Sequence, residues 1–228
     1  MSQSDTTHSS VWPRLSIVDF GSCTESLQTR FSPDAPRPCL GKSDLNFAIN
    51  APAGYRPPVN GALATLFFDR DDCVRALPSD CYQVKCAHHL NAEAFLGWAE
   101  QGILLLTHPL MQVGLIGTDL MDLLRVLRAT PSRQLHLAIL PYDNPPAVPW
   151  EQLQRFRFRN LFASLFAGPE LDLEMYAELG CALEQINPNM QEVFLTANYY
   201  SSPPILLLLG EQDPSGSSDA RMRHISSQ

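Results

Sequence analysis

The stretch GWAEQGILLLTHPLM, residues 97–111, decides how the fold is predicted from the sequence. Its apolar run at 103–106 follows a Gln-Gly pair and is typical of a short buried strand. Thr107, His108 and Pro109 come next, at the carboxyl end of that strand. Because parallel α/β sheets bind ligands at the carboxyl ends of their strands, this point is either the rim of a site or an ordinary strand exit.

Outward from this stretch, apolar runs and amphipathic patterns alternate along the chain. We predict strands at residues 15–20, 45–51, 103–106, 135–140 and 192–197, with a short apolar run at 205–209. We predict helices at residues 62–68, 94–99, 118–128, 151–166 and 170–186, and an irregular segment at 78–92. This alternation favours an α/β fold with a single domain, in which helices flank a mostly parallel central sheet.

Polar and apolar segments set the expected domain limits. We predict a disordered arm at residues 1–12, one folded domain at 13–210 and a disordered tail at 211–228. The amino terminus lacks the apolar run of a signal peptide, and no stretch approaches the roughly 20 apolar residues of a membrane helix. We therefore expect an intracellular protein that makes no membrane contact.

Charge restricts the expected partners. The chain has 228 residues, with 16 Lys and Arg against 24 Asp and Glu, and a net charge of −8. Coating of phosphate backbones relies on clustered cationic side chains, so strong nucleic-acid binding is disfavoured. One basic cluster stands out, RFRFR at residues 155–159. Its arginines either contact phosphate or line a solvated helix face.

The cysteines give no metal pattern. Cys73, Cys81 and Cys86 lie close in sequence to His88 and His89, but their spacing matches no common zinc motif. Without a signal for an oxidising compartment, we expect free thiols. We therefore predict neither a metal nor a cofactor.

Three segments carry a resemblance to a known family. GWAEQGILLL at residues 97–106 resembles the G-W-A-x-Q-G-V-L-L-L stretch of family 1 uracil-DNA glycosylases. LNFAIN with the proline-rich loop after it is similar to that family's strand and loop, and VFLTANYYSSPP at 193–204 looks like its V-L-x-T-A-H-P-S-P-L segment. The resemblance covers residues 15–210 and implies a glycosylase-like α/β fold.

The resemblance also implies roles for single residues. Cys23 falls at the position of the family's catalytic Asp, and Asn198 at that of its catalytic His. Phe47 matches the Phe that stacks on the flipped base, and Thr107 replaces the Asn that reads uracil. Ile205 corresponds to the Leu that wedges into the base stack. A further group is implied to contact DNA or a partner: Pro57, Pro58, Tyr199 and Tyr200.

These substitutions argue against glycosylase chemistry. A thiol is mostly neutral at pH 7, so Cys23 cannot stabilise an oxocarbenium ion as a carboxylate does. Thr107 offers one hydroxyl where an amide offered a donor and an acceptor together. The sequence therefore predicts a uracil-DNA glycosylase fold with eroded catalytic motifs, which acts as a non-catalytic binding or structural module.

Two alternatives stay open at this point. One is an active but divergent uracil-DNA glycosylase of base-excision repair that has rebuilt its site with Asp19, Glu25 or His108. The other is a chance likeness on a doubly wound α/β domain of unrelated function. The expected partner is a protein, DNA binding is expected to be weak, and a nuclear location is expected only if the DNA link survives.

Overall fold

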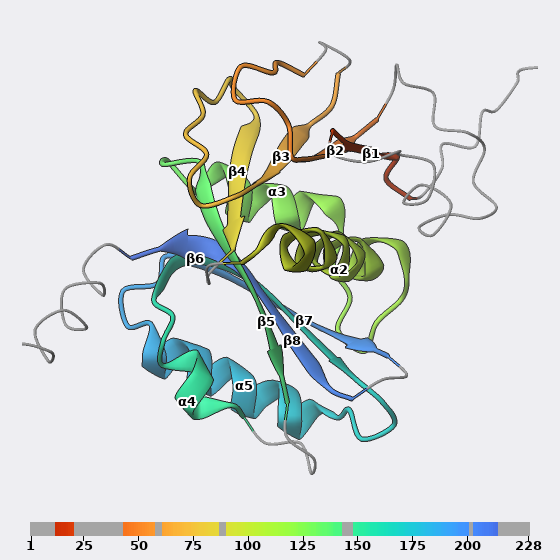
Figure 1. Cartoon of the computed structure of the whole chain (residues 1–228). Helices are drawn as coiled ribbons and strands as arrows, with labels where there is room; N and C mark the ends of the chain where they lie inside the picture. Colours follow the sequence, from red (N-terminus) through yellow and green to blue (C-terminus); the bar gives the residue numbers. More distant parts are fainter. Residues whose placement is uncertain are drawn as a thin grey trace, which may run out of the picture.

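The computed structural model describes residues 12–20, 43–57, 61–86, 90–142, 148–200 and 203–213. Its centre is a sheet of eight strands in the order β1-β2-β3-β4-β5-β8-β6-β7 (Figure 1). The strands are β1 Leu15–Asp19, β2 Leu45–Ile49, β3 Ala64–Asp69, β4 Cys81–Cys86, β5 Gln134–Pro141, β6 Phe158–Ala167, β7 Glu192–Tyr199 and β8 Ile205–Gln212. The helices are α2 Ala92–Met111, α3 Leu120–Arg128, α4 Trp150–Leu153 and α5 Leu173–Ile186.

The sheet is mostly parallel, which confirms the predicted α/β class. Strands β1 to β5 pair in parallel with their neighbours, and β6 pairs in parallel with β7. Only β8 runs antiparallel, between β5 and β6. The chain thus forms one continuous sheet, in which we distinguish the half-sheet β1–β4 from the half-sheet β5–β8.

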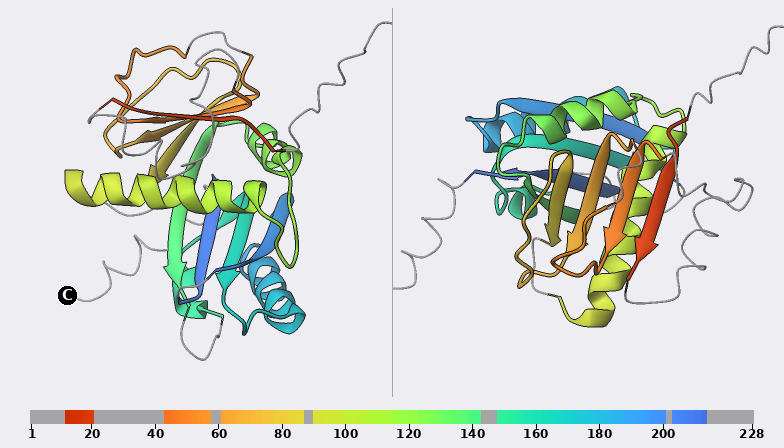
Figure 2. Two further views of the ribbon diagram at one scale, coloured as in Figure 1. Left: turned by 90° about the vertical axis from the view of Figure 1, so that its right-hand side faces the viewer. Right: turned by 90° about the horizontal axis from the view of Figure 1, so that it is seen from above.

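Helix α2 joins the two half-sheets, and Figure 2 shows it lying across the molecule between them. Asn91 caps its amino terminus by accepting a hydrogen bond from the Ala94 backbone N–H at 2.8 Å. Together with α3 it covers one face of the sheet and shares a large apolar core with the half-sheet β1–β4 and with β5, β6 and β8.

The predicted strand at 103–106 is wrong, because these residues form the middle of α2. Ile103, Leu105 and Leu106 are fully buried in the core shared by both half-sheets. A helix buried on several sides shows no clear polar face, so its apolar run cannot be told from a buried strand by period alone. The predicted short helix at 94–99 is the first part of the same helix.

Three further predictions are wrong for a related reason. The predicted helix at 62–68 is strand β3, and the segment predicted to be irregular at 78–92 contains β4. The predicted helix at 151–166 is the short α4 followed by β6. Nearly every residue of β3 and β6 is buried, so neither strand shows a regular polar alternation.

Elements with one exposed face were predicted correctly. Helix α3 has buried leucines on one side and charged residues on the other, and Asp119 and Asp122 form a capping box at its start. Helix α5 and strands β1, β2, β5 and β7 also fall at their predicted places, and β8 contains the apolar run noted at 205–209.

The two half-sheets cover their second faces differently. On the half-sheet β5–β8, the second face packs against α4 and α5 in a separate apolar core. On the half-sheet β1–β4, Ala48, Phe67 and Cys81 pack instead against Tyr55 and Leu77, which come from the connections after β2 and β3. Within the described residues, no helix is long and apolar enough to cross a membrane.

Candidate functional site

The residues that the glycosylase resemblance marked as a site lie in different elements of the fold. Phe47 is buried in β2, with its ring 6.2 Å from that of Phe68. Thr107 lies inside α2, and its hydroxyl donates to the Ile103 carbonyl at 2.8 Å. Asn198 is buried in β7 and donates to the Ser164 hydroxyl at 3.0 Å. Each of these three side chains is buried and contacts its own neighbours in the core.

The remaining predicted site residues do not share one element of the fold. Tyr199 is exposed at the end of β7, whereas Tyr200 packs its ring 6.0 Å from those of His108 and Phe166. Ile205 begins β8. Pro57 follows the loop after β2, and Cys23 and Pro58 lie outside the described residues. The site that these residues were predicted to form stays a prediction, without support from the fold.

A buried polar network occupies the carboxyl ends of β2 and β3. The Arg75 guanidinium donates to both Asp69 carboxylate oxygens, at 2.9 and 2.7 Å, and to the carbonyls of Ala51 and Pro52 at 2.8 and 3.0 Å. Gln83 of β4 donates to the same carboxylate at 2.8 Å. The guanidinium also stacks 4.1 Å above the centre of the Phe67 ring.

This network fills the place where a parallel sheet would hold a ligand. Arg75 and Asp69 are almost completely buried and satisfy each other, so neither is available to a substrate. The described parts of the connections after β2 and β3 contain no helix, so they offer no helix amino terminus to a phosphate group. The network therefore fixes the loops that cover the half-sheet β1–β4.

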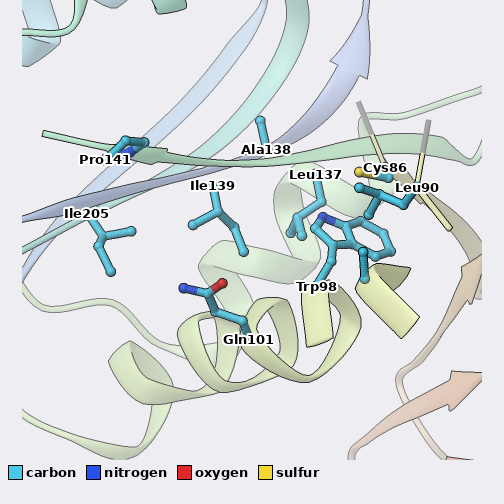
Figure 3. Close-up of a pocket in the computed structure, with 10 residues that line it drawn as sticks. Cys86, Leu90, Trp98, Gln101, Leu137, Ala138, Ile139, Pro141 and Ile205 are labelled. Atoms are coloured by element: carbon cyan, nitrogen blue, oxygen red, sulfur yellow. The ribbon is translucent and has the colours of Figure 1, made fainter. Parts of the chain in front are cut away.

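A pocket of about 430 Å³ lies between α2 and β5 (Figure 3). Trp98 and Gln101 of α2 face Ile139 of β5 and Ile205 of β8 across it. Among the described residues, Cys86 is the only ionisable side chain in its lining. The described lining can hold a small apolar group, and it contains no acid–base pair for catalysis.

The connection between α2 and α3 is fixed to the edge of β7. Ile116 and Ala197 exchange two backbone hydrogen bonds at 3.1 and 3.2 Å, and the Thr196 hydroxyl donates to the Ile116 carbonyl at 2.6 Å. A Cβ at Gly114 would collide with the Asn198 side chain and the Ala197 carbonyl, so only glycine allows this close approach. The connection is therefore held firmly while Val113 projects from it, 89% exposed.

Titratable groups do not gather into a catalytic or metal site. Among the described residues, no group of three or more His, Cys, Asp or Glu side chains is placed to hold a metal ion. Burial lowers the pKa of His108, and burial together with nearby Lys85 lowers the pKa of His136. Burial raises the pKa of the thiols of Cys73 and Cys81, which makes them poor nucleophiles at neutral pH.

Sequence reasoning missed both the Arg75 network and the exposed connection after α2. An Asp at the end of an apolar run, followed by an Arg in the next loop, is the sequence signal for the Arg75 network. The signal was missed because the run that ends in Asp69 was predicted to be a helix. An apolar Val-Gly-Leu-Ile-Gly segment between two helices, residues 113–117, is a signal for the second. Neither signal is specific without the fold.

Comparisons with known proteins give a fold likeness. No family model matches the chain, and no curated protein matches it. Its structure is similar to an FtsZ dimer from M. jannaschii described as empty, with 13% identity and a TM-score of 0.52 over 76% of this chain and 64% of that one. It is also similar to CetZ from Methanosaeta thermophila strain DSM 6194, with 12% identity and a TM-score of 0.50 over 80% of this chain and 65% of that one.

A third similar structure is a protofilament of CetZ2 from Haloferax volcanii bound to GTPγS. It has 12% identity and a TM-score of 0.50, over 88% of this chain and 75% of that one. The chain spans 64% and 65% of the lengths of the first two structures. At identities this low, the likeness shows the fold alone.

This likeness overturns the resemblance to uracil-DNA glycosylases. The strand taken as the glycosylase L-L-L strand is part of helix α2, and the similar structures are FtsZ and CetZ proteins. The predicted glycosylase-like fold, the eroded-glycosylase function and the active-glycosylase alternative are therefore wrong. The predicted role in DNA repair is therefore wrong as well.

Proposed function

We propose that this protein assembles head to tail with copies of itself into linear oligomers. The fold likeness to a protein solved as a protofilament carries this proposal, and the likeness to one solved as a dimer supports it. When one surface of a copy binds a different surface of the next copy, each end of the oligomer keeps one unoccupied surface that can bind a further copy. Growth then continues for as long as the rotation between copies does not close a ring.

Two exposed valines support this arrangement. Val74 is 85% exposed in the connection between β3 and β4, and Val113 is 89% exposed in the connection between α2 and α3. These connections lie on opposite sides of the molecule in Figure 1. Apolar side chains that project into water from anchored loops gain free energy when a partner covers them. One valine on each side suits a contact between unlike surfaces.

Assembly in this proposal does not require a nucleotide held at the ends of β2 and β3. Arg75, the buried cation at that edge, is engaged by Asp69 and by backbone carbonyls. The amino terminus of α2 carries Glu93 in its first turn, which disfavours an anion there. This chain therefore differs in its expected requirements from the CetZ2 protofilament solved with GTPγS.

Sedimentation velocity over a range of protein concentrations tests the proposal. We expect the average mass to rise with concentration past that of a dimer, with and without added GTP and Mg²⁺. Val113→Asp is expected to leave the protein largely monomeric, because it damages one side of every contact. Ala92→Asp adds the same charge at the exposed first residue of α2, outside the pocket, and is expected to leave assembly unchanged. A strictly monomeric wild-type protein would reject the proposal, and assembly only with GTP would reject its nucleotide independence.

A further inference from the structure

Positive and negative side chains are separated along the second half of the chain. Between residues 125 and 159 there are six arginines, and the only acidic residues are Asp143 and Glu151. From residue 160 to residue 213 there is no Lys or Arg, and residues 86–124 also lack both. The fold turns this separation in sequence into a separation in space.

Strand β6 separates the two kinds of charge. Arg155, Arg157 and Arg159 lie at its start, and Arg155 is exposed. Beyond its end, Glu170 and Asp172 lie exposed in the turn that leads into α5, and Glu174 lies exposed in the first turn of that helix. With ten residues, β6 spans roughly 30 Å at the rise of a β-strand. That span exceeds the screening length of about 8 Å at physiological salt, so each end acts on its surroundings separately.

Neighbouring elements bring further charged residues to both ends of β6. The Asn160 amide at the start of β6 donates to the Ala129 carbonyl at 2.7 Å, which brings the carboxyl end of α3, with Arg125 and Arg128, next to the arginines of β6. We call this group the arginine end. At the other end of the sheet, the bridge between Ile116 and Ala197 brings the connection after α2, with Asp119, beside the end of β7. We call that side, with the acidic turn before α5, the acidic end.

Among the described residues, the arginines of the arginine end form no ion pairs. The ion pairs between described residues are Arg14 with Asp44 and Arg75 with Asp69, and neither involves this end. Arg157 donates to the carbonyls of Gln154 and Phe156. Glu192 of β7 lies near Arg159, and Glu211 and Asp213 lie beside Asn160 and Arg157. These three acidic residues lower the net charge of this end, but its five arginines outnumber them.

We propose that the arginine end of one copy pairs with the acidic end of the next, so that charge sets the direction of assembly. This inference rests on the proposed self-assembly and specifies its contact. Head-to-tail stacking brings unlike charges together, whereas head-to-head stacking places arginines opposite arginines and is disfavoured. The acidic remainder of the chain makes a second copy a better partner for this end than a nucleic acid, which the net charge of −8 repels.

Charge reversal at each end tests the contact. The first variant carries Arg128→Glu and Arg155→Glu, and the second carries Glu170→Lys and Glu174→Lys; all four side chains are exposed. Each variant alone is expected to lower the apparent association constant by about tenfold or more, because it places like charges in contact. The protein with all four changes restores unlike charges and is expected to assemble again. Circular dichroism melting checks folding, and Arg155→Gln replaces the first variant if that variant melts early.

The outcomes separate this inference from the proposal beneath it. If the wild type assembles and both reversed variants assemble equally well, the charge pairing is rejected while self-assembly stands. If each variant fails and the combined protein also fails, pairing between these two ends is rejected. If the wild type does not assemble at any salt concentration, self-assembly itself is rejected. Binding of the wild type to a DNA duplex, lost with Arg128→Glu and Arg155→Glu, would assign the arginine end to nucleic acid instead.

Discussion

The half-sheet β1–β4 and the half-sheet β5–β8 bury their second faces by different means. Helices α4 and α5 cover β5–β8 with an apolar core that includes Leu179 and Leu183. Over β1–β4, two connections take the place of helices and are held by Arg75 through two carbonyls, the Asp69 carboxylate and the Phe67 ring. A loop has no apolar stripe of its own, so directed hydrogen bonds must fix it where a helix would pack.

This difference indicates how stability is distributed. On the helix-covered side it comes from apolar area spread over many side chains, each of which contributes a modest share. On the loop-covered side much of it depends on one buried ion pair, whose loss leaves an uncompensated charge. The two sides should therefore respond differently to single substitutions.

Arg75→Leu is expected to have the largest effect. It leaves the Asp69 carboxylate buried without its cation and frees the two carbonyls, at a cost of about 3–5 kcal/mol in the free energy of unfolding. Urea denaturation measures the loss, and hydrogen exchange should show weaker protection in β3 and β4 than in β6 and β7. Uniform loss of protection over the whole sheet would contradict the separate role of the network.

Leu179→Ala is the matching change on the helix-covered side. Leu179 is fully buried between α5 and the half-sheet β5–β8, and truncation is expected to cost about 2–5 kcal/mol. The same exchange experiment should now show the loss in β6 and β7. Protection that falls first in β3 and β4 would mean that the two second faces are not independent.

Gly102→Ala tests the junction between the two half-sheets. A Cβ at this position would lie 2.7 Å from a Leu137 methyl group of β5 and 3.3 Å from the Phe68 ring of β3. Because flexible side chains can give way, we expect a loss of about 1–3 kcal/mol, partly offset by the higher helix propensity of Ala. Gly97→Ala in the same helix, where nothing lies within 4 Å, should be neutral or stabilising. Equal effects of the two changes would show that α2 does not pack tightly at this junction.

The smallest effect concerns His108. Burial lowers its pKa, so the unfolded chain takes up a proton first as the pH falls below the ordinary value of about 6.5. Stability from this group is complete above that value and decreases below it, as the unfolded chain takes up the proton. Denaturation midpoints at about pH 7 and pH 5.5 measure the change, and His108→Phe should reduce it without removing the contribution of His136. A variant with the same pH dependence as the wild type would exclude His108 as a source.

The sequence predicted elements that expose one face, and it also located β2 and the apolar run of β8, although most of their residues are buried. Helix α3 shows its capping residues and its leucine stripe directly, and β5 has exposed or half-buried positions that limit it. Part of helix α2 was predicted to be a strand, and strands β3 and β6 were predicted to be helices. Each of these elements is buried on more than one side, so it lacks the polar face from which a helical or strand period can be read.

The candidate site was less predictable than the fold. The arginines at 155–159 were recognised as unusual, but their helix face does not exist, since residues 158 and 159 already belong to β6. Their meaning depends on the acidic turn at the other end of that strand, which no local pattern reveals. The Arg75 network likewise joins three separate segments. Contacts between distant segments depend on the order of the strands in the sheet. The sequence predicted the α/β class but not this order.

The central claim is that unlike surfaces of successive copies join head to tail, and a mixture of two variants tests it most directly. Val74→Asp and Val113→Asp each damage one of the two most exposed valines of the described residues and leave the other side intact. In sedimentation velocity, each variant alone should be largely monomeric. The equimolar mixture should stop at a dimer, because the two intact sides join and both outer sides are damaged. A mixture that stays monomeric, or variants that assemble like the wild type, would contradict the account.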